Sequence, residues 1–182
     1  LKDQRDIARV ERIEKSISKL EYLYRKISHF IKRDLYKIER EKVSLDKVIK
    51  ERVEIFEDFR KNGFILDLEP LVVEIDKFAL EEALDNLIEN SMKYSDKDIK
   101  IELKGDILTI KDRGVGMEPS ELLRVFERYY QGKGAKKGEG IGLYLVKRFC
   151  DEEDILLKIE SQKDQGTSVI LDFSKRVVKN GV

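Results

Sequence analysis

The hydrophobic pattern of this 182-residue chain changes its period near residue 62, and this change constrains the fold more than any other feature. Before it, apolar residues recur at alternating steps of three and four, the spacing of a narrow coiled-coil seam. The seam contains Val10, Ile13, Ile17, Leu20, Tyr24, Ile27, Ile31 and Ile38. After Asn62 and Gly63, short alternating apolar segments predict strands. The sequence therefore predicts a helical segment, 1–43, followed by an α+β domain, 44–182.

The helical segment should form one long amphipathic helix over about residues 5–42. Its apolar face is too narrow to be stable alone, so we expect it to pair with another helix. Self-association is favoured over packing on its own domain because the seam is both narrow and sustained. Ser44 is a candidate N-cap for a second helix over 45–61.

The second part alternates strand and helix patterns. Strands are predicted at 64–68, 71–75, 99–103, 107–111, 155–160 and 167–173, and helices at 77–94, 119–126 and 141–149. The turn at Gly105-Asp106 and the turn ending at Gly166 predict antiparallel hairpins, whereas 127–139 has the composition of a loop. This order predicts a two-layer α/β sandwich with a mixed, mostly antiparallel sheet.

Charge and composition exclude several classes of protein. The chain has 37 basic and 37 acidic residues, so it is not a generally basic nucleic-acid binder. No run of 18 apolar residues is present, as a membrane-spanning helix would require. The single cysteine, Cys150, cannot form an internal disulfide, which fits a reducing compartment such as the cytoplasm. Residues 126–148 carry a net charge of +4, so a basic segment exists within the neutral chain.

The helix over 77–94 carries the first candidate site. Asn86, Asn90 and Lys93 are spaced four and three residues apart, so they share one helix face. Amide oxygens are good ligands for a hard cation, and a lysine one turn further suits a phosphate. Taken alone, the same pattern also fits a solvated polar face.

A second candidate site, Asp112-Arg113-Gly114-Val115-Gly116, follows a predicted strand. A buried carboxylate accepts hydrogen bonds from an amine, and glycines let backbone approach a ligand closely. An ordinary turn is the alternative reading of this motif.

The third and fourth candidate sites flank the predicted loop. Gly138, Gly140, Gly142 and Leu143 open a helix whose backbone amides suit phosphate, without matching a dinucleotide-binding or Walker A pattern. Arg128 precedes the loop and is a candidate for contacting a terminal phosphate. A loop that needs positive φ angles and a solvated basic loop are the respective alternatives.

Together, these motifs resemble the ATP-binding catalytic domain of sensor histidine kinases, in the superfamily that also contains gyrase, heat-shock chaperone and mismatch-repair ATPases. The resemblance covers about residues 45–174 and rests on the segments NLIENSMKYS, DRGVGM, FERYYQ and GEGIGLYLVK. It implies a Bergerat-type α/β sandwich that holds ATP and Mg²⁺ under a flexible lid.

The resemblance also implies a role for each matched residue. Asn90, with Asn86, would ligate the magnesium, and Lys93 and Tyr94 would contact phosphate and nucleotide. Asp112 would accept from the adenine amine in a pocket shaped by Gly114 and Gly116, supported by Thr167. The phosphates would be held by Arg128, Lys137, Gly138, Gly140, Gly142 and Leu143.

By the same resemblance, hydrolases of the superfamily carry a water-activating glutamate where this chain has Asn86. An asparagine cannot act as a general base, so we expect phosphoryl transfer to a protein histidine. The implied partners are a response regulator and a second copy bound through the N-terminal helix, with no nucleic acid. The implied location is the cytoplasm, with any membrane attachment in regions outside this chain.

His29 is the only histidine, and it lacks the acceptor pattern of the family. No acid follows it directly, no proline stands at the fifth position, and it precedes Asn90 by too few residues. We therefore expect the acceptor histidine to lie outside this chain, which would be a fragment. The alternatives are a non-catalytic nucleotide-sensing interaction module and a serine kinase of the anti-sigma type.

Overall fold

The computed structural model of the protein describes residues 39–57, 63–132 and 140–178. The chain divides into two compact units, Leu1–Glu39 and Arg40–Val182. Nearly all of the first unit, including the predicted coiled-coil seam and His29, lies outside the described residues, so the long helix stays a prediction. The second unit has the fold described below.

The second unit is a two-layer sandwich whose larger sheet has five strands in the order β2-β4-β5-β7-β6. Its strands are β2 (Phe64–Leu68), β4 (Ile99–Lys104), β5 (Ile107–Lys111), β6 (Leu156–Gln162) and β7 (Gly166–Asp172). Only β2 and β4 are parallel, whereas the other neighbouring pairs are antiparallel. The expected mixed, mostly antiparallel sheet is thus confirmed.

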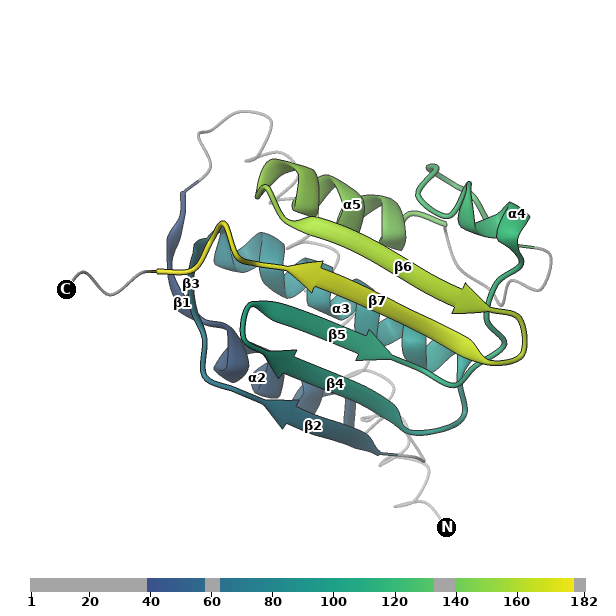
Figure 1. Ribbon diagram of the computed structural model, residues 1–182, viewed down its shortest axis with the longest axis horizontal. Helices are drawn as coiled ribbons and strands as arrows, with labels where there is room; N and C mark the ends of the chain where they lie inside the picture. Colours follow the sequence, from purple (N-terminus) through teal and green to yellow (C-terminus); the bar gives the residue numbers. More distant parts are fainter. Residues whose placement is uncertain (1–38, 58–62, 133–139, 179–182) are drawn as a thin grey trace, which may run out of the picture. The chain divides into compact units, whose positions relative to one another are not determined.

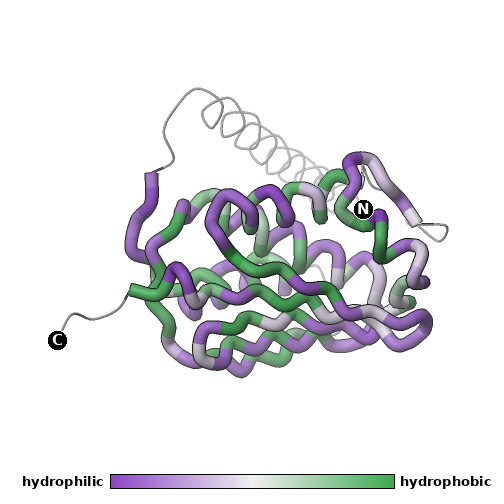
Figure 2. Tube along the Cα trace, turned by 45° about the horizontal axis from the view of Figure 1, so that its top comes forward, coloured by the Kyte–Doolittle hydropathy of each residue, from purple (hydrophilic) through white to green (hydrophobic). Residues whose placement is uncertain are grey.

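Three helices cover one face of this sheet (Figure 1). They are α2 (Leu45–Glu57), α3 (Lys77–Tyr94) and α5 (Gly142–Glu152). Hydrophobic and hydrophilic residues alternate along the strands, so that one face is apolar (Figure 2). In β4, for example, Ile99, Ile101 and Leu103 are fully buried under the helices.

Helix α3 was predicted with its start and end. The Asp76 side chain accepts a hydrogen bond from Ala79 N at 3.0 Å, which caps the first turn. The helix ends at Tyr94, because Ser95 adopts extended backbone. This helix carries the first candidate site along its length.

The predicted end of the long helix was wrong. Glu41 and Lys42 belong to strand β1 (Glu41–Ser44) and not to the end of a long helix. This strand pairs antiparallel with β3 (Val72–Ile75) in a separate two-stranded sheet. Ser44 ends that strand, and its hydroxyl donates a hydrogen bond to Asp46 Oδ1 at 2.9 Å. The pairing buries Val43, which a solvated helix end would leave exposed.

Other helix boundaries also differ from the predictions. Helix α4 (Pro119–Leu122) is one turn long and does not reach Phe126 as predicted. The chain continues from Leu123 in turns. Helix α5 extends to Glu152, three residues beyond the prediction. In α2, described helix ends at Glu57, and 58–62 lie outside the described residues.

The core contains the one cysteine of the chain. Cys150 lies on α5 and is fully buried. Burial in apolar surroundings raises the pKa of its thiol to about 12. The thiol is therefore protonated and packs as a small apolar side chain.

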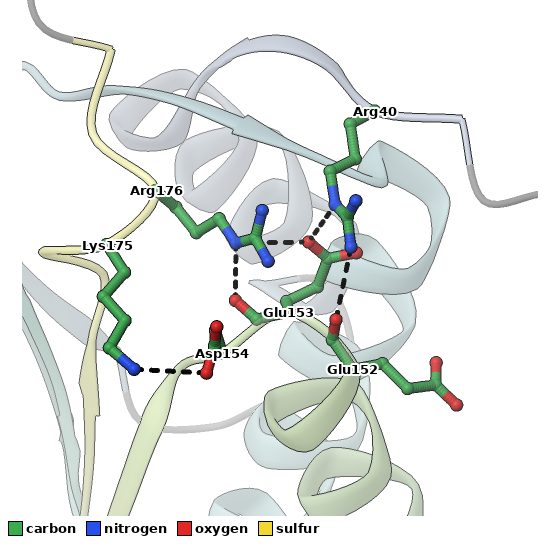
Figure 3. Close-up of polar contacts among 6 residues, drawn as sticks. All are labelled: Arg40, Glu152, Glu153, Asp154, Lys175 and Arg176. Atoms are coloured by element: carbon green, nitrogen blue, oxygen red, sulfur yellow. Dashed lines mark hydrogen bonds and ion pairs between the residues drawn. The ribbon is translucent and has the colours of Figure 1, made fainter.

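A buried carboxylate joins both ends of the unit (Figure 3). Glu153, directly after α5, has a fully buried side chain. Arg40 Nε lies 2.9 Å from its Oε2, and Arg176 Nε lies 3.6 Å from the same oxygen. Arg176 also donates to the Glu153 backbone oxygen at 2.6 Å. The residue that opens the unit and a residue near its end thus share one acidic partner.

None of the helices in the described part of the chain combines the length and apolar character needed to cross a bilayer.

Candidate nucleotide site

Asp112 lies directly after β5 and is buried. Its Oδ1 accepts hydrogen bonds from Gly114 N at 2.7 Å and from Thr167 N at 3.3 Å. Its backbone N–H donates to Thr167 O at 2.9 Å, so Asp112 continues the pairing of β5 with β7. These contacts fix the carboxylate at the start of the loop that follows β5.

Three glycines allow backbone segments to meet around Asp112. A Cβ at Gly114 would lie 2.2 Å from Tyr94 O, and one at Gly116 would lie 2.0 Å from Gln162 O. A Cβ at Gly166 would lie 2.2 Å from Asp112 O. Gly116 and Gly166 also have positive φ angles, +61° and +108°. Sequence reasoning identified the first two, but it treated Gly166 only as a turn residue.

Hydrogen bonds hold the 113–117 loop from both sides. Val115 N donates to Tyr94 O at 3.2 Å, which ties the loop to the end of α3. On the other side, Asp164 N donates to Val115 O at 2.7 Å and Met117 N donates to Ser161 Oγ at 2.9 Å. The loop is therefore hydrogen-bonded to α3 on one side and to the β6–β7 hairpin on the other. No motif indicated Ser161, because its contact joins residues 44 positions apart.

Asn86 and Asn90 lie beside the first turn of α5. A Cβ at Gly142 would be 3.0 Å from Asn86 Oδ1 and 3.6 Å from Asn90 Nδ2. The Asn86 side chain is buried, and its Nδ2 donates to Glu82 O at 2.8 Å. The structure thus brings both amides to a helix N-terminus, where backbone N–H groups lack partners within the helix.

Arg128 lies at the same helix end. Its guanidinium is 4.9 Å from the centre of the Tyr144 ring, in the first turn of α5, and 5.8 Å from the Tyr129 ring. Tyr129 N donates to Gly140 O at 2.9 Å, and a Cβ at Gly140 would lie 2.7 Å from Tyr130 O. A cationic side chain and a close backbone contact therefore sit next to the Asn86 and Asn90 amides.

A comparison with known protein families now identifies the chain. Residues 75–177, which contain all of the contacts above, match the family described as histidine kinase-, DNA gyrase B- and HSP90-like ATPases. The chain belongs to this family. Its second unit is an ATPase domain of the histidine kinase type, and the resemblance noted in the sequence is confirmed.

Individual sensor histidine kinases are also similar to this chain in sequence. The sensor histidine kinases YvrG and YkoH of Bacillus subtilis are 31% and 32% identical to it, over 91% and 60% of this chain. The sensor protein BceS of Halalkalibacterium halodurans is 33% identical over 84% of this chain. The chain spans 30%, 26% and 48% of these three relatives, respectively.

Solved structures share the fold of this ATPase domain. The mycobacterial sensor histidine kinase MprB is 26% identical, with a TM-score of 0.67 over 72% of this chain and 95% of that chain. The catalytic domain of histidine kinase ThkA has a TM-score of 0.64 at 20% identity, over 74% of this chain and 95% of that chain, which supports the fold.

The remaining candidate residues of the ATPase domain are placed differently. Lys93 and Tyr94 contact each other, with Lys93 Nζ 4.8 Å from the ring centre. Lys93 also borders an apolar hollow lined by Phe56, Glu89 and Met92. Leu143 packs against the core from the first turn of α5. Lys137 and Gly138 lie outside the described residues, so their roles stay predictions.

An ion pair between α2 and α3, which was not predicted from the sequence, supports α3. Arg52 on α2 donates to Asp85 in a two-pronged contact, Nε to Oδ1 at 2.7 Å and Nη2 to Oδ2 at 2.6 Å. Asp85 is buried, and it directly precedes Asn86. A charge pattern of period three or four on one helix cannot reveal such a contact, because the partners lie on different helices.

The rim of the site carries a charged contact between α4 and the β6–β7 hairpin. Lys163 Nζ lies 2.7 Å from Glu118 Oε1, and this hydrogen bond raises the pKa of Lys163. Lys163 is consequently cationic throughout the physiological pH range.

The described residues fit a magnesium nucleotide. No group of three or more His, Cys, Asp or Glu side chains is gathered for a metal ion in the described ranges. Asn86 Oδ1 faces the space that a side chain at Gly142 would fill, next to the helix N-terminus. Amide oxygens beside phosphate oxygens are a suitable ligand set for magnesium, which commonly takes part of its coordination from the nucleotide.

Proposed function

We propose that this chain is the catalytic portion of a two-component sensor kinase, which binds Mg-ATP and transfers the γ-phosphoryl group to a histidine. The observation that supports this proposal is the buried Asp112 carboxylate, which accepts from Gly114 N among close-packed glycines, in the same domain as the Asn86 and Asn90 amides beside the first turn of α5. A buried acceptor suits an amine of the base, whereas amides at a helix N-terminus suit phosphates.

Each end of the site has a separate task. Asp112 accepts a hydrogen bond from the adenine amine, and the backbone of Gly114 and Gly116 shapes the walls. The N-terminus of α5 and Arg128 attract the phosphates, with Lys93, Lys137 and Gly138 as further contacts. Asn90 and Asn86 hold magnesium, which when bound neutralises charge on the phosphates.

Phosphoryl transfer is favoured over ATP hydrolysis because of Asn86. Its amide cannot take a proton from water, and its Nδ2 is already engaged with the Glu82 carbonyl. The site positions the terminal phosphate for an external nucleophile. At this helix position it has an amide and not a carboxylate that could act as a general base. The acceptor is then a histidine that lies outside this chain, in a protein that dimerises through the N-terminal segment, 1–43. The phosphoryl group passes on from it to a response regulator.

Nucleotide binding is the first test. Asp112→Asn should weaken binding of a fluorescent ATP analogue about tenfold or more, because it replaces an acceptor oxygen in a buried site. Asp151→Asn is the matched control, since that aspartate is 60% exposed at the far end of α5. Equal affinity of Asp112→Asn and the unaltered protein would refute the proposed site.

Magnesium dependence tests the other end of the site. Asn90→Ala should abolish the gain in analogue affinity that magnesium gives and leave metal-free binding largely intact. A variant that retains the full magnesium effect would contradict the role of Asn90.

Transfer is tested with a relative that retains its acceptor histidine but has a disabled ATP site. Mixing it with this protein and ATP labelled at the γ position should label the partner with an acid-labile group, as phosphohistidine is. Binding without transfer would instead favour a nucleotide-sensing module, and an acid-stable product would favour a serine kinase.

A further inference from the structure

The hydroxyl of Ser161 lies at the junction of three segments around the adenine end of the site. Ser161 is on β6 and is half-buried. Its Oγ accepts from Met117 N at 2.9 Å, and it lies 2.9 Å from both Gly166 O and Thr167 Oγ1. One oxygen atom thus connects the 113–117 loop with the first two residues of β7.

Counting protons sets the direction of these bonds. Ser161 has one hydroxyl proton, and Gly166 O can only accept. All three contacts are hydrogen bonds only if Ser161 donates to Gly166 O and Thr167 donates to Ser161 Oγ. In this arrangement the Thr167 proton is committed to Ser161, and Thr167 Oγ1 offers lone pairs to other groups.

Thr167 is placed beside Asp112 by two backbone contacts. Asp112 N donates to Thr167 O at 2.9 Å, and Thr167 N donates to Asp112 Oδ1 at 3.3 Å. The Asp112 carboxylate and the residue that carries the acceptor hydroxyl therefore lie next to each other across the pairing of β5 with β7. An exocyclic amine offers two N–H donors and matches two acceptors, directly or through a water, whereas a 6-oxo group does not.

From this network we infer that Ser161 is a specificity-determining residue. By holding the Thr167 hydroxyl as an acceptor, it makes the site select 6-aminopurine over 6-oxopurine nucleotides. This inference rests on the proposed function, since it concerns the base bound at Asp112. Without Ser161, the Thr167 hydroxyl turns freely and can donate to a 6-oxo group, which relaxes the discrimination.

The test compares ATP with inosine triphosphate, which replaces the 6-amino group by oxygen. Affinities of both are measured for the unaltered protein, Ser161→Ala and Thr167→Val. Each variant should lower the preference for ATP roughly threefold to tenfold, the range of one neutral hydrogen bond. The double variant should lose no more than the single ones, because both changes remove the same contact.

Two controls separate this role from simple loop stapling. Ser161→Thr keeps a hydroxyl and should keep the preference. Ser168→Ala alters the adjacent β7 residue, which lies on the opposite face of the sheet and pairs with Glu160, and should change neither affinity.

The outcomes distinguish the ideas. If Ser161→Ala weakens both nucleotides by the same factor, or changes neither, the inference is overturned and Ser161 only staples the loop. If circular dichroism shows Ser161→Ala to be unfolded, Thr167→Val decides, and an unchanged preference in it overturns the inference. If the unaltered protein binds neither nucleotide, the proposed function itself fails.

Discussion

Gly116 shows how the absence of a side chain shapes the loop that follows Asp112. Its φ of +61° is unfavourable for other residues, and a Cβ there would meet Gln162 O at 2.0 Å. Gly105 has a similar φ of +54°, but no atom lies within 4 Å of its would-be Cβ. Both positions have an unfavourable backbone conformation, but only at Gly116 does another backbone segment lie close. Comparing them therefore separates the effect of backbone strain from the effect of this close contact.

Replacing each by alanine should give different results. Gly105→Ala should lower the free energy of unfolding by about 1 kcal/mol, the cost of a left-handed alanine. Gly116→Ala should lower it further and also weaken nucleotide binding, because the β6–β7 hairpin must move away. Urea unfolding and analogue titration measure both effects, and equal losses for the two variants would show that the close contact is unimportant.

Cys150 predicts a pH effect on stability. Burial raises the pKa of its thiol from the ordinary value of 9.0 to about 12 in the folded protein. The unfolded chain therefore loses this proton first, and stability falls as pH rises from about 9 towards 12. Cys150→Ala removes this contribution, so the stability difference between the two proteins should shrink across that range. A difference independent of pH would contradict a buried, protonated thiol.

Helix α2 supports α3 through a largely buried ion pair. The Arg52–Asp85 pair has side chains only 19% and 6% exposed, so removing one partner leaves a largely buried charge. Arg52→Met should cost about 3 kcal/mol of unfolding free energy, and adding Asp85→Leu should restore part of it. Lys158→Met is the control, because its pair with Glu160 is exposed and worth under about 1 kcal/mol. Urea unfolding measures all three, and no recovery in the double variant would argue against an uncompensated charge.

Elements with local signals were predictable from the sequence. Helix α3 carries its own cap, Asp76, and its own period, so its bounds and the Asn86 and Asn90 face follow from neighbouring residues. Strand β1 lacks such signals, since its four residues are stabilised by pairing with β3 about thirty positions later. The same limit hid Ser161, whose partners come from a loop and a neighbouring strand.

In the unit as a whole, the two arginines that contact Glu153 should contribute unequally to stability. Arg176 is 20% exposed and also donates to the Glu153 carbonyl at 2.6 Å, whereas Arg40 is 34% exposed and donates to the Glu152 carbonyl at the longer distance of 3.3 Å. Arg176→Met should therefore destabilise by about 2 kcal/mol and Arg40→Met by about 1 kcal/mol. Lys175→Met, which removes a pair with Asp154 at the surface, should change little. Thermal unfolding ranks the three, and the reverse order would refute this account.

The shared carboxylate also brings the beginning and the end of the unit together. Arg40 and Arg176 reach Glu153 (Figure 3). Val177 also pairs with Val73 of β3, the strand that pairs with β1. Domains whose ends are adjacent tolerate circular permutation and insertion into other chains. A short linker from Val178 back to Arg40, with new ends opened at the Gly105 turn, should retain the five-stranded sheet. The two ends of the described unit, Arg40 and Val178, therefore lie on the same side of it.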